Sequence, residues 1–287
     1  MPKGTIRTIL LAALLLFLAP ATPARAADLP ERVRNSGVLR VGSQQTYPPI
    51  EFREPRTKAV QGVSAELLAE IARRLGLRLE WVQSDYGALI TGARAGRFDV
   101  VSGGISDQPE RQKELDFVNY MRTGTGILCL AERAGEFHTI ADFSGKKVAF
   151  TLGAKRVETA VAEASAALRA AGAPPIESVM LPNTLDAKMQ LDIRRVDGYL
   201  NETPTLAYMM RQNPGKYALV QDGAYILTHL ATSWGFAKSD DVLRDAVRRT
   251  AQEMLEDGTY AAIMTKWNLA GSMLPAITIN QPMEGRP

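Results

Sequence analysis

The sequence predicts an α/β protein built from two lobes. Short apolar segments alternate with amphipathic helical segments, an order typical of α/β folds with largely parallel sheets. The alternation occurs in two series, near residues 38–120 and 147–220, and no low-complexity linker separates them. The chain has 287 residues, 46% of them apolar, which is enough for two closely joined lobes.

The first series begins with a strand and an amphipathic helix. Residues 38–42 (VLRVG) have the pattern of a short buried strand. Ser64 is a suitable N-cap residue for a helix whose leucines share one face, and Gly76 would end that helix. Residues 77–81 alternate between apolar and polar, which predicts a second strand. The series is completed by a helix over 86–95 and a strand over 98–102.

The second series repeats this order. Residues 147–151 (KVAFT) predict its first strand, and the alanine-rich segment at about 155–171 predicts a helix. Thr203 and Pro204 are typical of a helix start, with proline at the first helical position. The other predicted elements are a strand near 179, a helix at 184–191, strands at 196–200 and 233–237, and helices at 243–255 and 260–267.

The first 26 residues have the pattern of a secretory signal peptide. Lys3 and Arg7 form a positive start, residues 9–19 form an apolar run, and Ala24-Arg25-Ala26 places small residues where a signal peptidase reads them. A helix over that run would span only about half of a ~30 Å hydrocarbon core, which argues against a transmembrane anchor. We therefore expect cleavage after Ala26 and a periplasmic protein.

The composition excludes several classes of function. The chain has 34 basic and 31 acidic residues, but Lys3, Arg7 and Arg25 belong to the predicted signal peptide. Without these three, 31 basic residues balance the 31 acidic ones, so no nucleic-acid partner is expected. One cysteine and two histidines leave little material for a disulfide framework or a metal site, and we expect no metal and no cofactor.

A polar turn follows the predicted strand at 98–102. The segment 102–111 reads SGGISDQPER, with two glycines that let the backbone approach a ligand, then Ser106 and Arg111. An arginine can hold a carboxylate through two parallel hydrogen bonds, and open α/β sheets bind ligands at strand ends. By itself, this pattern is also that of a glycine-rich turn with a surface arginine.

Taken in order, the motifs of the chain resemble family 3 extracellular solute-binding proteins, the polar-amino-acid receptors of ABC importers. The matching segments are LRVG at 39–42, YPP at 47–49, GRFD at 96–99, IS at 105–106, PER at 109–111, GKKVA at 145–149, RVD at 195–197 and DGTY at 257–260. The resemblance implies a type II periplasmic binding protein fold, with a ligand cleft between two α/β lobes. We expect lobe 1 to comprise residues 27–121 and 221–287, and lobe 2 to comprise residues 122–220.

The resemblance also implies a binding site and a partner. Arg111 would grip the carboxylate of a small amino-acid-like solute with help from Ser106, and the Gly104 carbonyl would take its amino group. Glu202 would pair with the ammonium, and the 151–155 turn would close from the second lobe. Hinge closure would present the loaded protein, expected to be a monomer, to an ABC permease in the inner membrane. The aromatic residues expected to cover the ligand are Tyr47, Phe52 and Tyr86, each of which could instead be ordinary core.

Three positions depart from the family pattern. Glu202 stands where an aspartate is usual, and it is longer by one methylene. Ala154 lacks the hydroxyl that the family commonly has there; the neighbouring Lys155 could supply a charge or point to solvent. Asp107 adds a negative charge close to the expected carboxylate site. These departures put the identity of the ligand in question more than its small size and charge.

An enzyme on the same fold is the alternative interpretation. Some secreted proteins that resemble this family are cyclohexadienyl (prephenate/arogenate) dehydratases. Arg111 could hold the substrate carboxylate, and Glu202 could be a general acid if burial raised its pKa. We favour an ion pair between Glu202 and a ligand ammonium, and therefore a binding protein without catalytic residues.

Overall fold

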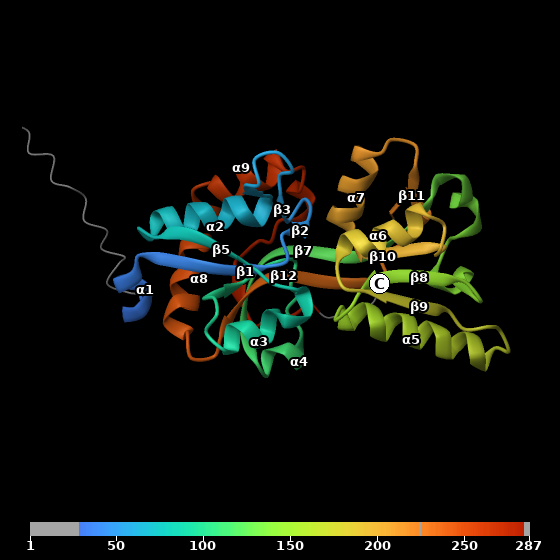
Figure 1. The fold of residues 1–287 in the computed structure, drawn as a ribbon, viewed down its shortest axis with the longest axis horizontal. Coiled ribbons are helices and arrows are strands. Elements are labelled where there is room, and N and C mark those ends of the chain that lie inside the picture. The colour runs from blue at the N-terminus through green and yellow to red at the C-terminus, as the bar shows by residue number, and fades with distance from the viewer. Residues whose placement is uncertain (1–28, 224, 284–287) are drawn as a thin grey trace, which may run out of the picture.

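The computed structural model describes residues 29–223 and 225–283, so the predicted signal peptide lies outside the described residues. Figure 1 shows two groups of helices and strands, joined by strands that run between them. The helices are α1 (Glu31–Ser36), α2 (Val63–Arg74), α3 (Leu89–Arg94), α4 (Pro109–Gln112), α5 (Lys155–Ala170), α6 (Thr184–Asp192), α7 (Thr203–Gln212), α8 (Asp241–Glu256) and α9 (Thr259–Lys266). The strands are β1 (Val38–Ser43), β2 (Thr46–Tyr47), β3 (Glu51–Arg53), β4 (Val60–Gln61), β5 (Arg78–Gln83), β6 (Val100–Val101), β7 (Leu115–Leu130), β8 (Lys147–Thr151), β9 (Glu177–Leu181), β10 (Gly198–Glu202), β11 (Tyr217–Leu219), β12 (Thr228–Ala237) and β13 (Thr278–Ile279).

One sheet extends through both lobes. Its order is β5-β1-β6-β12-β7-β10-β8-β9, with β11 and β13 also paired to β7. The outer pairs β1–β5, β1–β6, β8–β9 and β8–β10 are parallel, as the alternating pattern predicts. The central pairs that involve β7 and β12 are antiparallel. The two predicted parallel series are therefore halves of a single mixed sheet, joined by an antiparallel centre.

The strands β7 and β12 are the connection between the lobes. Strand β7 has 16 residues, and all except Arg122 are buried. Its pairing with β12 runs from Leu115 opposite Ala237 to Thr125 opposite Thr228, with a register shift between Thr232 and Ser233. The middle of β7 carries threonines and glycines rather than an apolar run, which is why no strand was predicted there.

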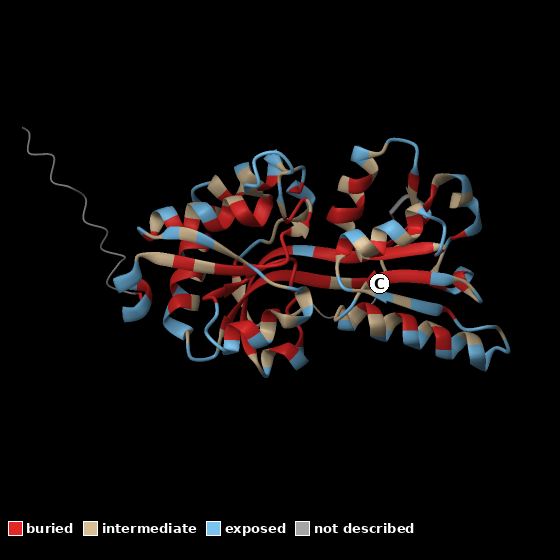
Figure 2. Ribbon diagram, viewed as in Figure 1, coloured by how far each residue is buried: buried red, intermediate tan, exposed pale blue. Residues whose placement is uncertain are grey.

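Each lobe has its own core. In lobe 1 a cluster centred on α2, α8 and α9 includes Trp234, whose ring stacks on that of Tyr120 with centroids 4.3 Å apart. In lobe 2 one cluster surrounds Phe143 and Phe150, and another surrounds Tyr199. Figure 2 shows buried residues along the strands and exposed residues on the outer helix faces. This packing is compatible with the predicted lobe boundaries, which stay a prediction.

Two helices begin differently from the prediction. Gly62 precedes α2, and Glu202 precedes α7, so neither Ser64 nor Thr203 is the N-cap residue. Ser64 is instead buried. Its hydroxyl is satisfied there, because it accepts a hydrogen bond from Trp234 Nε1 at 2.9 Å and lies 2.8 Å from Ser102 Oγ. Pro204 does stand in the first turn of α7, as predicted.

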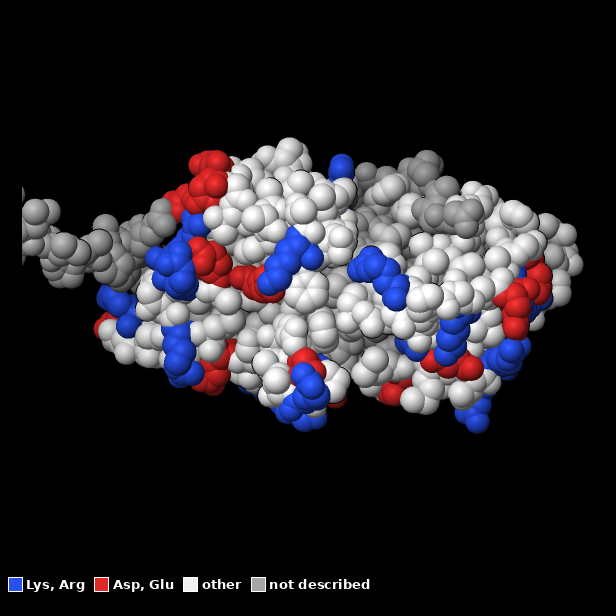
Figure 3. All heavy atoms as spheres, turned by 90° about the horizontal axis from the view of Figure 1, so that it is seen from above, with Lys and Arg blue, Asp and Glu red and all other residues white. Residues whose placement is uncertain are grey.

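The described surface mixes charges of both signs. Figure 3 shows acidic and basic side chains interspersed over one face of both lobes. No helix within residues 29–223 and 225–283 combines the length and the apolar character needed to cross a bilayer.

Candidate functional site

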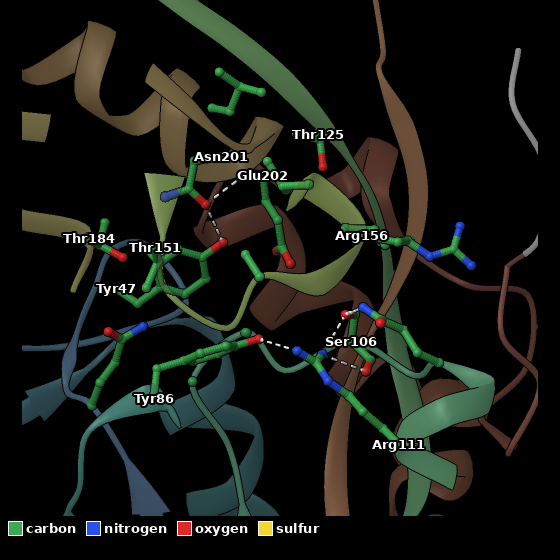
Figure 4. Close-up of a pocket in the computed structure, with 18 residues that line it drawn as sticks. Tyr47, Tyr86, Ser106, Arg111, Thr125, Thr151, Arg156, Thr184, Asn201 and Glu202 are labelled. Carbon is green, nitrogen blue, oxygen red and sulfur yellow. Dashed lines mark hydrogen bonds between the residues drawn. The ribbon is translucent and has the colours of Figure 1, made fainter. Parts of the chain in front are cut away.

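A pocket lies where the two lobes meet. Its empty volume, which includes space that is open to solvent, is about 510 Å³. Lobe 1 contributes the ends of β1 and β6 and the start of α4, and lobe 2 contributes the ends of β8 and β10 and the start of α6. Figure 4 shows side chains from these elements converging on one space. Strand ends from both halves of the sheet therefore build the site together.

Arg111 is the cationic centre of the lobe 1 side. It lies in α4 and is only 7% exposed. Its Nη1 donates to Ser106 Oγ at 2.8 Å and to the Ser106 carbonyl at 3.1 Å. Its Nη2 donates to Tyr86 Oη at 3.3 Å and to the Gly153 carbonyl of lobe 2 at 3.0 Å. A ligand carboxylate is an anionic acceptor, and it can displace the neutral acceptors on Nη2.

Asp107 does not face this guanidinium. It is 1% exposed, and its two carboxylate oxygens accept hydrogen bonds from Gln112 Nε2 at 2.7 Å and Asn119 Nδ2 at 3.1 Å. Burial raises the pKa of Asp107, and these two hydrogen bonds oppose that rise. Asp107 is not among the lining residues, so the predicted conflict with a bound carboxylate does not arise.

Gly104 and Tyr47 form the floor of the pocket. Gly104 has a φ of +72°, and a Cβ atom there would lie 2.1 Å from Tyr47 Cε1. Only glycine fits, because both the backbone conformation and the aromatic ring exclude a side chain. The Tyr47 hydroxyl donates to Asn201 Oδ1 of lobe 2 at 2.8 Å, which makes a second hydrogen bond between the lobes.

Glu202 is the acidic centre of the lobe 2 side. It ends β10, is 7% exposed, and accepts a hydrogen bond from Thr232 Oγ1 at 3.3 Å. Burial raises the pKa of Glu202 to about 7, although the hydrogen bond from Thr232 and the charge of Arg111 act in the opposite direction. The pocket therefore holds a carboxyl group whose charge an incoming cation would stabilise.

Most of the predicted site residues line this pocket. They are Arg111, Ser106, Gly104, Glu202, Tyr47, Tyr86 and Ala154. Phe52 does not line it, because its ring packs against Tyr208 and Trp267, at centroid distances of 5.9 and 6.2 Å. Lys155 lies outside the pocket as well. Its side chain is 70% exposed and pairs with Glu158 at 2.7 Å.

Several lining residues were not predicted. These include Gln44, Gln108, Thr125, Arg156, Thr184 and Asn201, whereas Thr151 belongs to the predicted 151–155 turn. Most of them have neutral side chains at element ends, a pattern that is common in any α/β sequence. Their position after or before a predicted element was an available signal, but it does not say which ends face each other.

The geometry defines a class of protein. Two α/β lobes, joined by two strands, enclose a pocket that holds a buried arginine on one side and a buried carboxyl group on the other. Among the described residues, no group of three His, Cys, Asp or Glu side chains could hold a metal ion. This is the architecture of a protein that encloses a small charged solute between its lobes.

Comparison with known proteins identifies the family. Residues 39–270 match the model of the bacterial extracellular solute-binding proteins, family 3, and the chain belongs to that family. The arginine-binding protein ArgT of Corynebacterium glutamicum is 26% identical over 90% of this chain and 83% of its own. The histidine-binding periplasmic protein of Salmonella typhimurium is 25% identical, over 88% and 94%. The ancestral amino acid-binding protein AncCDT-1, a precursor of cyclohexadienyl dehydratase, has a crystal structure and shares 27% sequence identity with this chain. It aligns with a TM-score of 0.73 over 82% of this chain and 97% of its own.

Proposed function

We propose that this solute-binding protein captures an α-amino acid in the interlobe pocket. The ligand carboxylate binds Arg111 and Ser106 of lobe 1, and the ammonium binds Glu202 of lobe 2 and the Gly104 carbonyl. The observation that supports this arrangement is a buried cation and a buried carboxyl group on opposite lobes of one pocket. A zwitterion can pair with both, and two desolvated charges would otherwise be costly.

Closure of the lobes accompanies binding. Strands β7 and β12 carry the chain between the lobes and supply the hinge. Opening at this hinge would break two hydrogen bonds between the lobes, from Arg111 to Gly153 and from Tyr47 to Asn201. The ligand carboxylate takes the place of the Gly153 carbonyl on Nη2, and the ligand itself then joins the lobes by bonding Arg111 of lobe 1 and Glu202 of lobe 2. Binding then shifts a population of open molecules to the closed form.

The closed protein delivers its solute to an ABC permease. A histidine-binding relative is named as periplasmic, and the predicted signal peptide supports export with cleavage after Ala26. In the periplasm, a monomer would meet the permease at the outer face of the inner membrane. We propose that the protein is not an enzyme and that the closed state is what the permease recognises.

A thermal-shift panel tests this function. The purified protein is heated with each proteinogenic amino acid, with amines and organic acids, and with prephenate. A ligand that binds only the folded state stabilises it by about 2.7 kcal/mol at a concentration ~100 times its Kd, so a true ligand raises the melting temperature clearly. We expect a selective rise with α-amino acids. A panel in which no α-amino acid raises the melting temperature would contradict the proposal.

The buried Glu202 also supports a second candidate function, that of a dehydratase. Glu202 is buried with a pKa of about 7, which suits a general acid, and AncCDT-1 is a precursor of a dehydratase. A dehydratase would expel water and carbon dioxide from prephenate, with Arg111 holding the carboxylate. Incubation of the purified protein with prephenate, followed by absorbance of the aromatic product, separates the two functions. We expect no turnover.

A further inference from the structure

We propose that the cargo is an amino acid with a neutral, hydrogen-bonding side chain. This inference rests on the proposed function, because it assumes that Arg111 and Glu202 take the two charges common to all α-amino acids. It concerns what remains of the pocket after those charges are paired.

The charges of the pocket do not favour a cationic side chain. Among the described residues that line it, Glu202 is the one acid, and Arg111 and Arg156 are bases. A second cation on the ligand would have no carboxylate partner among these lining residues. Asp107 cannot serve, because it is buried outside the lining and its oxygens are already paired. A desolvated cation without a partner is strongly disfavoured.

An anionic side chain is not favoured either. Arg156 is the basic side chain left after Arg111 is paired, but its Nη1 points to the His229 carbonyl at 3.5 Å. In Figure 4 its guanidinium lies on the far side of the pocket and is directed away from Glu202 and Arg111. Arg156 therefore lines the pocket with the aliphatic part of its side chain, and its guanidinium group is not directed at a ligand inside the pocket.

Neutral polar groups face the remaining space. Thr151 and Thr184 line the pocket on the side opposite Arg156 in Figure 4. Asn201 lies on the same side, but its amide already bonds Tyr47 and Tyr199. Thr184 is 1% exposed, and its hydroxyl lies near the Tyr199 phenol but makes no hydrogen bond at normal geometry to any described residue. A buried hydroxyl without a partner is costly, and a ligand amide or hydroxyl would satisfy it. The specificity therefore differs from that of the relatives named for arginine and histidine.

Calorimetric titration with matched amino acids tests the inference. Glutamine, asparagine, threonine and serine represent neutral polar side chains, arginine, lysine and histidine represent basic ones, and glutamate and aspartate represent acidic ones. Alanine, valine and leucine probe an apolar side chain. We expect at least one neutral polar amino acid to bind about tenfold or more tightly than every member of the other classes.

Two substitutions at Thr184 locate the specificity. Thr184→Val removes the hydroxyl and keeps the shape, and we expect an affinity loss of about three- to tenfold for the neutral polar ligand. Thr184→Asp adds a second carboxylate, and we expect arginine to gain about tenfold or more relative to that ligand. Thr250→Val is the matched control, because Thr250 is a buried threonine of α8 whose hydroxyl bonds only within its helix. It should leave affinity unchanged.

The outcomes separate this inference from the proposed function. Tightest binding of a basic, acidic or apolar amino acid would overturn the inference and leave the proposed function standing. Unchanged affinity in Thr184→Val, with the fold intact by circular dichroism, would also overturn it. If no α-amino acid binds at all, the proposed function itself is wrong.

Discussion

The Nη2 atom of Arg111 donates a hydrogen bond to the Gly153 carbonyl at 3.0 Å, and this bond joins the two lobes across the pocket. The same guanidinium is anchored in its own lobe by Ser106. Arg111 is therefore both the proposed carboxylate-binding group and a direct link between the lobes. Ligand binding and lobe closure act on the same side chain.

Replacement of Arg111 should weaken ligand binding severely. Arg111→Ala leaves the ligand carboxylate buried without its partner, and we expect a loss of about 2–5 kcal/mol of binding free energy by titration calorimetry. Arg94→Ala is a suitable control, because Arg94 is a largely exposed arginine paired with Glu114 at the surface. Wild-type affinity in Arg111→Ala would disprove the carboxylate assignment.

Ligand affinity should rise with pH. The pKa of Glu202 in the unliganded pocket is about 7, and an ammonium ligand binds the charged form. The binding-competent fraction therefore grows by about tenfold between about pH 6 and about pH 8, and the apparent Kd should fall by the same factor. Titration at both pH values measures this change. Glu202→Gln should bind weakly with no such pH dependence, and a wild-type Kd that does not vary with pH would refute the Glu202 assignment.

A side chain at position 104 should disrupt the pocket. Gly104→Ala forces a Cβ atom into Tyr47 and adds strain at a φ of +72°. We expect a stability loss of about 2–4 kcal/mol in urea unfolding, together with weaker ligand binding. Gly135→Ala is the control, because a Cβ atom there meets nothing within 4 Å. Equal stability of the two variants would argue against the close packing of Gly104 and Tyr47.

The buried carboxyl group of Glu51 should make stability depend on pH. Glu51 lies in β3, is fully buried, and accepts a hydrogen bond from Ser102 Oγ. Burial raises its pKa from 4.5 to about 7, despite hydrogen bonds from serines and from the Gly103 backbone. The folded state therefore holds this proton more tightly than the unfolded chain does, and its contribution to stability is lost as the pH rises from about 4.5 through 7.

Unfolding by urea at about pH 5 and about pH 8 measures this effect, which we expect to be about 1–3 kcal/mol. Glu202 contributes with the same sign, so the difference between wild type and Glu51→Gln isolates Glu51. Glu51→Gln should lose less stability than wild type over this range. Identical pH profiles for the two proteins would show that Glu51 does not carry the effect.

Local patterns were sufficient for the individual elements and for part of the site. Strands such as β1 and β8, and helices such as α2 and α5, follow from apolar periodicity, which depends only on neighbouring residues. Arg111, Ser106 and Glu202 were identified because they stand in motifs that resemble a family whose site is built there. Phe52 was also predicted from a motif, but it lies outside the lining of the pocket, because its ring packs against Tyr208 of lobe 2 and Trp267 of lobe 1.

The amino-acid sequence by itself determined the alternation of strands and helices, the motifs of the family and the chemistry of Arg111 and Glu202. Only the tertiary structure decided that β7 and β12 join both halves into one sheet, that Asp107 faces Asn119, and that Thr184 faces the pocket. The physical reason is the separation along the chain over which each effect acts. Periodicity and capping act over a few residues, whereas the pocket is formed by residues far apart in the chain, whose meeting depends on strand pairing across the whole sheet.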